Sequence, residues 1–198
     1  MKEIKTTCYK GTRILLGNEK RSLLNKMVEY LISNGFKEIS MPIIQTQKIF
    51  KDKVGEENNN LMFNFKDRGD WDLCLAPEYT AVIQKLAKTE FKNEKNVRLF
   101  YIQECFRGEK PQAGRYRQFT QIGVEWLNPN IGKPNDVLKE IAANLIQVGG
   151  YDWNDFYMNT GVTRGLDYYK NGKGFEILCE KLGTQKQVCG GGEYDGGI

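Results

Sequence analysis

Polar and apolar residues alternate along two segments of the sequence, Leu99–Arg107 and Tyr116–Trp126. Successive strand residues point to opposite faces of a sheet, so each segment should form one apolar row and one polar row. The polar rows contain Gln103, Arg107, Gln121 and Glu125. Gly123 lies in the same row and would leave room above the sheet for a ligand. The alternative is that this face only meets water, as polar faces of antiparallel sheets commonly do.

Cationic side chains gather around the segment that joins these two strands, Gly108–Arg115, which contains two glycines and a proline. The cations are Arg107, Lys110, Arg115 and Arg117. Guanidinium groups pair with phosphate oxygens through two parallel hydrogen bonds, so this cluster suits a polyphosphate. A solvated basic turn is the alternative.

Two later segments also have side chains that could contact a ligand. Thr163–Tyr169 holds an arginine, an aspartate and two tyrosines, which could line a pocket for a small polar molecule. Cys189–Gly197 is rich in glycine, and glycine allows the backbone to approach a ligand closely. The alternatives are a surface turn for the first segment and a flexible end for the second.

The elements that must position these groups follow from hydrophobic spacing and from breaker residues. The sequence predicts a helix over Asn18–Asn34, a strand over Glu38–Ile44, a hairpin of Leu61–Phe65 with Trp71–Leu75, a helix from Pro77 to Ala87, and a helix over Val137–Val148. Several strands joined by tight turns, together with interspersed helices, predict an α+β fold with a largely antiparallel sheet.

Composition restricts the chemistry further. The chain has 198 residues, which suits a single domain over residues 1–198, and a net charge of +4. It contains no histidine, which excludes a histidine general base, a Ser-His-Asp triad and a histidine-ligated metal. Its five cysteines are scattered and odd in number, which predicts reduced thiols rather than a disulfide framework. Without an apolar leader or membrane span, the expected location is the cytoplasm.

Six segments in chain order together resemble the catalytic core of class II aminoacyl-tRNA synthetases, most closely the histidyl-tRNA synthetase family. They are Lys10–Arg13, motif 1 at about 34–44, Ala76–Ala81, motif 2 at about 99–126, and the two histidine signatures at 164–169 and 189–196. The resemblance implies a six-stranded antiparallel sheet flanked by helices. It also implies a homodimer formed through the motif 1 region.

The same resemblance implies the residues that bind ATP, and Mg²⁺ as the accompanying ion. Arg107 would hold the α-phosphate and Glu109 the adenine amino group. Phe119 would stack on the adenine, and Arg115 would reach the outer phosphates. No set of protein metal ligands is expected.

For the amino acid, the resemblance implies a histidine pocket made of Glu78, Thr80, Gln121, Glu125, Arg164, Tyr168 and Tyr169. Arg107 and Arg164 would be the catalytic residues, and the product would be histidyl-adenylate, which a complete enzyme passes to tRNA. Adenylate formation needs positioning and positive charge rather than a protein nucleophile, so the lack of histidine does not oppose it.

The sequence also departs from the family pattern. Motif 3 and an anticodon-binding domain are not found, and Thr163 adjoins Arg164 where the family carries a long insertion. Ile14, Ala76 and Thr120 replace the family's aspartate, arginine and histidine. Two other functions therefore remain open. One is a regulatory subunit of ATP phosphoribosyltransferase, partnered with its catalytic subunit; the other is an amino-acid-activating protein that serves an acceptor other than tRNA.

Overall fold

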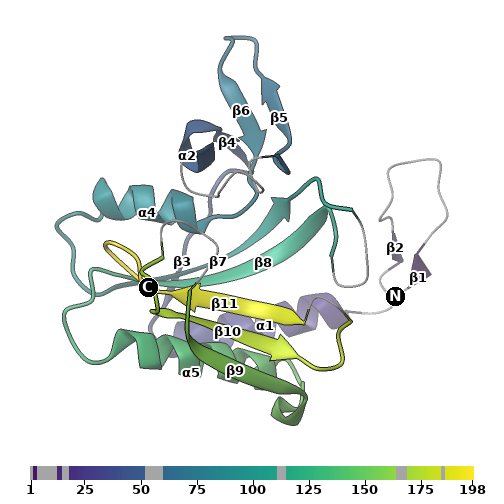
Figure 1. Ribbon diagram of the computed structural model, residues 1–198, viewed down its shortest axis with the longest axis vertical. Coiled ribbons are helices and arrows are strands. Elements are labelled where there is room, and N and C mark those ends of the chain that lie inside the picture. The colour runs from purple at the N-terminus through teal and green to yellow at the C-terminus, as the bar shows by residue number, and fades with distance from the viewer. Residues whose placement is uncertain are drawn as a thin grey trace.

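The computed structural model describes residues 2–3, 13–14, 18–51, 60–110, 115–163, 169–183 and 186–198, with the backbone alone for the first two ranges. They form the predicted α+β fold, in which antiparallel strands are packed against helices (Figure 1).

The two longest strands lie side by side at the centre of the molecule. β7 (Val97–Phe106) pairs with β8 (Gln118–Leu127) in antiparallel register along ten positions, as the alternation predicts. The short β3 (Lys37–Glu38) pairs with the other edge of β7 in parallel, which gives the order β3-β7-β8.

Three smaller sheets accompany this pair. β4 (Ile44–Thr46), β6 (Asp72–Leu75) and β5 (Asn64–Lys66) form one sheet, whose β5–β6 hairpin projects from the body in Figure 1. β9 (Phe156–Val162), β10 (Gly174–Cys179) and β11 (Gln187–Gly192) form another, with β10 in the middle. β1 (Lys2–Glu3) pairs with β2 (Arg13–Ile14).

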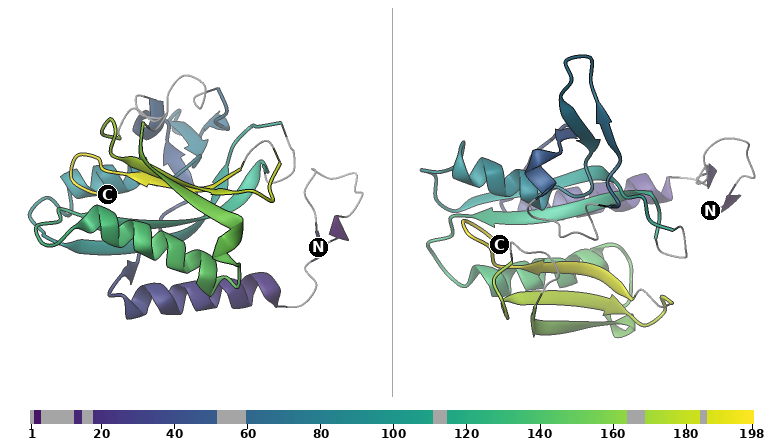
Figure 2. Two further views of the ribbon diagram at one scale, coloured as in Figure 1. Left: turned by 60° about the horizontal axis from the view of Figure 1, so that its bottom comes forward. Right: turned by 45° about the horizontal axis from the view of Figure 1, so that its top comes forward.

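Helices cover both faces of the β7–β8 pair. α1 (Glu19–Ser33) and α5 (Pro134–Val148) lie together on one face, where Leu31, Ile141 and Phe100 share a buried cluster (Figure 2). α4 (Thr80–Lys88) lies on the other face, where Ile83 packs into a second cluster with Tyr101. The remaining helical segments are α2 (Lys48–Lys51) and the 3-10 turn η1 (Trp153–Asp155).

Three expectations about the elements are wrong. Glu38–Ile44 is not one strand: β3 ends at Glu38 and β4 begins at Ile44, because Pro42 between them cannot donate to a ladder. α4 begins at Thr80 rather than at Pro77, and α5 begins at Pro134 rather than Val137, since Pro134 fits the first helical turn.

The described strands also form three separate three-stranded sheets and the β1–β2 pair instead of one six-stranded antiparallel sheet, and β3 is parallel to its neighbour. The chain after β11 returns to β8 over only a short stretch. Trp126 and Ile198 exchange two backbone hydrogen bonds of 2.9 and 3.1 Å, and the Asn128 amide donates to the Gly196 carbonyl. Glycine-rich Cys189–Gly197 is therefore ordered: it contributes to β11 and to the edge of β8.

No helix among the described residues is both long and apolar enough to cross a membrane. The described cysteines Cys74, Cys105, Cys179 and Cys189 are free thiols, and the first three are buried.

Candidate functional site

Glu125 lies near the end of β8 on the polar row, and only 4% of it is exposed. Its two carboxylate oxygens accept hydrogen bonds from hydroxyl groups, that of Thr80 at 3.0 Å and that of Tyr194 at 2.6 Å. Burial raises the pKa of Glu125 from 4.5 to about 8, the two hydroxyls oppose that rise, and the nearby Glu78 adds to it. Glu125 is thus a buried acid that holds its proton near neutral pH.

Glu78, also buried, caps the start of α4. Its oxygens accept the backbone N–H groups of Thr80 at 2.7 Å and Ala81 at 3.0 Å, which would otherwise lack partners at a helix start. Because the same Thr80 donates its hydroxyl to Glu125, the cap fixes a residue that touches the second carboxylate. The start of α4 therefore holds two predicted pocket residues, Glu78 and Thr80, close to a third, Glu125.

Tyr101 is a member of this cluster that the sequence did not single out. It faces Gly123 across the β7–β8 pair, is fully buried, and places its hydroxyl 3.4 Å from the Gln121 side-chain amide. Cys105 donates its thiol to the same amide group at 3.0 Å. The signal for Tyr101 was present in the alternation, which puts it in the same row as Gln103 and Arg107.

Residues of the segments before β10 and after β11 complete the cluster. Tyr194, the second residue that the sequence did not single out, follows β11 and donates to Glu125. Tyr169 lies beside it, with the two ring centroids 6.4 Å apart. Of the predicted pocket, the structure therefore brings together Glu78, Thr80, Gln121, Glu125 and Tyr169. Arg164 and Tyr168 lie outside the described residues.

The predicted ATP-binding residues lie further along the same two strands. Arg107, just after β7, donates its Nε to the Pro77 carbonyl at 2.9 Å, and its guanidinium carbon lies 5.2 Å from the centre of the Phe119 ring. Phe119 and Gln121 are alternate residues of β8, so the two groups of predicted residues are adjacent on one face.

The strand-joining loop holds a second polar group. Arg115 forms a 2.8 Å ion pair with Glu109, and Arg117 donates its Nε to the Glu109 carbonyl at 3.0 Å. Lys110 is exposed at the same turn. The structure therefore places Glu109 and Arg115 against each other, where the sequence predicted separate roles for them at the adenine and the outer phosphates.

The residues that the structure describes contain no group of three carboxylate or thiol side chains able to hold a metal ion. Mg²⁺ keeps much of its water and binds substrate phosphates, often with few protein ligands.

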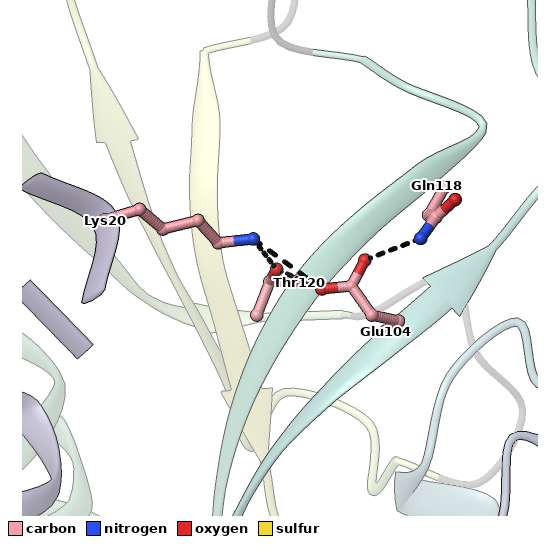
Figure 3. Close-up of polar contacts among 4 residues, drawn as sticks. All are labelled: Lys20, Glu104, Gln118 and Thr120. Carbon is pink, nitrogen blue, oxygen red and sulfur yellow. Dashed lines mark hydrogen bonds and ion pairs between the residues drawn. The ribbon is translucent and has the colours of Figure 1, made fainter. Parts of the chain in front are cut away.

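The opposite face of β7 and β8 carries its own polar cluster, shown in Figure 3. Thr120 donates to Glu104, its partner across the strands, and Gln118 contacts the other Glu104 oxygen at 3.2 Å. Lys20 of α1 donates to Thr120 at 2.6 Å and lies 3.7 Å from Glu104. These contacts attach the first turn of α1 to the strands that carry the candidate site.

Solved structures share this fold. The chain superimposes on apo histidyl-tRNA synthetase of Staphylococcus aureus with a TM-score of 0.69 at 23% identity, over 96% of this chain and 62% of that one. It also superimposes on a Bacillus halodurans protein described as an ATP phosphoribosyltransferase regulatory subunit/histidyl-tRNA synthetase. There the TM-score is 0.60 at 19% identity, over 78% of this chain and 41% of that one.

Among curated proteins, the histidine–tRNA ligase of Archaeoglobus fulgidus is 28% identical over 94% of this chain and 69% of its own length. That alignment spans 286 positions, so about a hundred positions of the relative have no counterpart in these 198 residues. An excess of about a hundred positions in the relative agrees with the expectation that this chain lacks the family's long insertion. Across the curated relatives, the chain spans between 37% and 69% of their lengths.

The family model described as histidyl-tRNA synthetase matches residues 17–130, more than half of the chain. The matched range contains both central strands, α4 and the carboxylates Glu78 and Glu125. With the shared fold and the order of its motifs, the chain belongs to the histidyl-tRNA synthetase family.

Proposed function

We propose that this chain binds histidine and ATP and joins them as histidyl-adenylate. The observation that carries the proposal is the environment of Glu125. Its carboxylate accepts hydrogen bonds from two hydroxyls, and among the described residues no lysine or arginine lies within ion-pair distance of it. A buried carboxylate needs a compensating charge in order to ionise, and the ammonium group of an amino acid supplies one.

The chemistry follows from this arrangement. The carboxylate of histidine attacks the α-phosphorus of ATP, a P–O bond forms, and the bond to the β-phosphate oxygen breaks as pyrophosphate leaves. Arg107 stabilises negative charge on the α-phosphate, and Arg164 does so beside the attacking carboxylate. Mg²⁺ that enters with ATP would supply further positive charge at the phosphates. Glu78, Gln121 and Glu125 hold the amino acid, and Tyr168 and Tyr169 line its side-chain end.

Two contacts would change when ATP binds. Arg107 now lies over Phe119, so stacking of adenine on Phe119 requires the guanidinium to move toward the α-phosphate. Arg115 now pairs with Glu109, so its use at the outer phosphates requires exchange of that partner, while Glu109 becomes available to the adenine amino group. Both rearrangements exchange one charged or aromatic contact for another.

Pyrophosphate–ATP exchange with each of the twenty amino acids tests the proposal. Histidine is expected to support exchange, and Arg107→Ala and Arg164→Ala are expected to lower it by at least a hundredfold, the usual cost of removing one charge-stabilising group. Arg68→Ala, at the exposed tip of the β5–β6 hairpin, is the matched control and should leave the rate unchanged. Exchange that survives Arg107→Ala would contradict the assignment.

Calorimetric measurement of histidine binding, combined with the exchange assay, separates the proposed function from the two alternatives. Histidine binding without exchange would favour the regulatory function, and co-purification with an ATP phosphoribosyltransferase catalytic subunit would identify it. Exchange without transfer to tRNA would favour activation for another acceptor. The joint retention of Glu78, Gln121, Glu125 and Tyr169 supports the synthetase reaction, because a regulator that does not form adenylate needs fewer of them.

A further inference from the structure

Tyr101 of β7 packs directly over Gly123, its partner in β8, on the pocket face of the two central strands. A Cβ atom added to Gly123 would lie 2.0 Å from the Tyr101 ring and 2.3 Å from its hydroxyl oxygen. No side chain can be accommodated at such a distance without moving the ring. The phenol of Tyr101 therefore fills the volume above Gly123 that the sequence assigned to a ligand.

The Tyr101 hydroxyl lies where the polar groups of the pocket meet. The Gln121 side-chain amide donates to it at 3.4 Å, and the same amide accepts the Cys105 thiol at 3.0 Å. The ring is fully buried. This hydroxyl of β7 thus holds the Gln121 amide of β8 on the pocket face.

Resting on the proposed function, we propose that Tyr101 determines the specificity of the amino-acid pocket. Its ring limits how deeply an amino-acid side chain can enter, and its hydroxyl orients the Gln121 amide toward a side chain that hydrogen-bonds. An amino acid with a short polar ring satisfies both conditions, whereas a larger apolar ring meets the phenol and offers the Gln121 amide no further hydrogen bond. A site built to hydrogen-bond its substrate discriminates strongly against an analogue that lacks the group.

Removal of the hydroxyl tests the second half of the proposal. Tyr101→Phe is expected to weaken histidine binding by about tenfold in calorimetry, the usual effect of one lost hydrogen bond in a buried site, and to leave ATP binding unchanged. Tyr79→Phe is the matched control. Tyr79 is equally buried, its ring centroid lies 5.5 Å from that of Tyr101, and its hydroxyl contacts the Glu104 carbonyl. Tyr79→Phe should alter neither the affinity for histidine nor the affinity for ATP.

Removal of the ring tests the first half. Tyr101→Ala is expected to raise exchange with phenylalanine, tyrosine or tryptophan relative to histidine by at least tenfold. Unchanged discrimination in this variant, or a histidine affinity in Tyr101→Phe equal to that of the wild type, would overturn the proposal.

A third variant, Gly123→Ala, tests the packing of the Tyr101 ring over Gly123 without any ligand. Gly123→Ala should lower the melting temperature in the wild-type background. The decrease should be much smaller in the Tyr101→Ala background, where the ring no longer meets the new Cβ. If Gly123→Ala lowers the melting temperature equally in both backgrounds, the Tyr101 ring does not pack against Gly123, and the proposal loses its structural basis. If wild-type protein does not bind histidine, the proposed function fails, whereas wild-type binding with an unaltered Tyr101→Phe variant overturns the Tyr101 proposal alone.

Discussion

A carboxyl group that is buried between two hydroxyls and close to a second carboxylate is expensive to ionise, and Glu125 is in that position. At pH 7 it carries a proton in the ligand-free protein, since its pKa is raised to about 8. An incoming ammonium group reverses this preference. Binding of an amino acid should therefore release a proton to the solvent, and calorimetry in two buffers of different ionisation enthalpy would detect the release.

The same pKa predicts how stability depends on pH. Below pH 4.5 the carboxyl is protonated in both states; between pH 4.5 and about 8 the unfolded chain loses the proton and the folded one retains it. The free energy of unfolding should thus fall as the pH rises through this window. Glu125→Gln removes this dependence, so its stability relative to the wild type should rise by on the order of a few kcal/mol between pH 5.5 and 8.5.

Urea denaturation at each pH measures the effect, and Glu140→Gln, an exposed position on α5, is the control. If the free energies of unfolding of Glu125→Gln and the wild type differ by the same amount at every pH, Glu125 ionises normally in the folded protein.

At this scale the sequence predicted much of the candidate site. A period of two was enough to place Gln121 and Glu125 in one row, because alternation in a strand is a local property. It did not single out Tyr101, since a tyrosine in such a strand is usually part of the core. Tyr194 could not be assigned to Glu125 at all: the two are 69 residues apart, and only the return of the chain after β11 to the end of β8 brings them together.

Among the elements, α4 depends on a cap that also belongs to the candidate pocket. Glu78→Ala leaves the N–H groups of Thr80 and Ala81 buried without their acceptor, and should destabilise the protein by about 1–3 kcal/mol. Denaturation with urea, together with hydrogen exchange of the α4 amides, tests this. Glu90→Ala, an exposed carboxylate beyond the other end of α4, should have almost no effect. Equal stability of the two variants would count against the cap.

Element types were more predictable than element boundaries. Apolar spacing located α1 to within one residue at each end, and alternation located β7 and β8. The errors fall at prolines. Pro42 was placed inside a strand although it separates β3 from β4, and Pro77 was taken as the first residue of a helix that starts at Thr80. The Glu78 side chain explains the second error, because it caps the helix from outside the first turn.

For the whole molecule, the expected homodimer needs a surface, and the motif 1 region presents one. Ile43 and Ile44 are 41% and 52% exposed beside Pro42, and Phe65 on the same small sheet is 38% exposed. Apolar side chains gathered in this way are typical of protein interfaces. We predict that Ile44→Glu converts a dimer to a monomer in light scattering at micromolar concentration. Ile131→Glu, at an exposed isoleucine after β8, should remain dimeric. A monomeric wild-type protein would contradict the prediction.

The contacts of Glu125 also affect how the protein folds. β7 and β8 are neighbours in the chain and can pair early, at a small loss of chain entropy. Thr80 and Tyr194, by contrast, are 45 and 69 residues from Glu125 in the sequence. Contacts of such separation cost more chain entropy and are slower to form. The carboxyl group should therefore remain hydrated, and acidic in the ordinary way, until the segments that carry Thr80 and Tyr194 dock, so that its raised pKa is acquired late in folding.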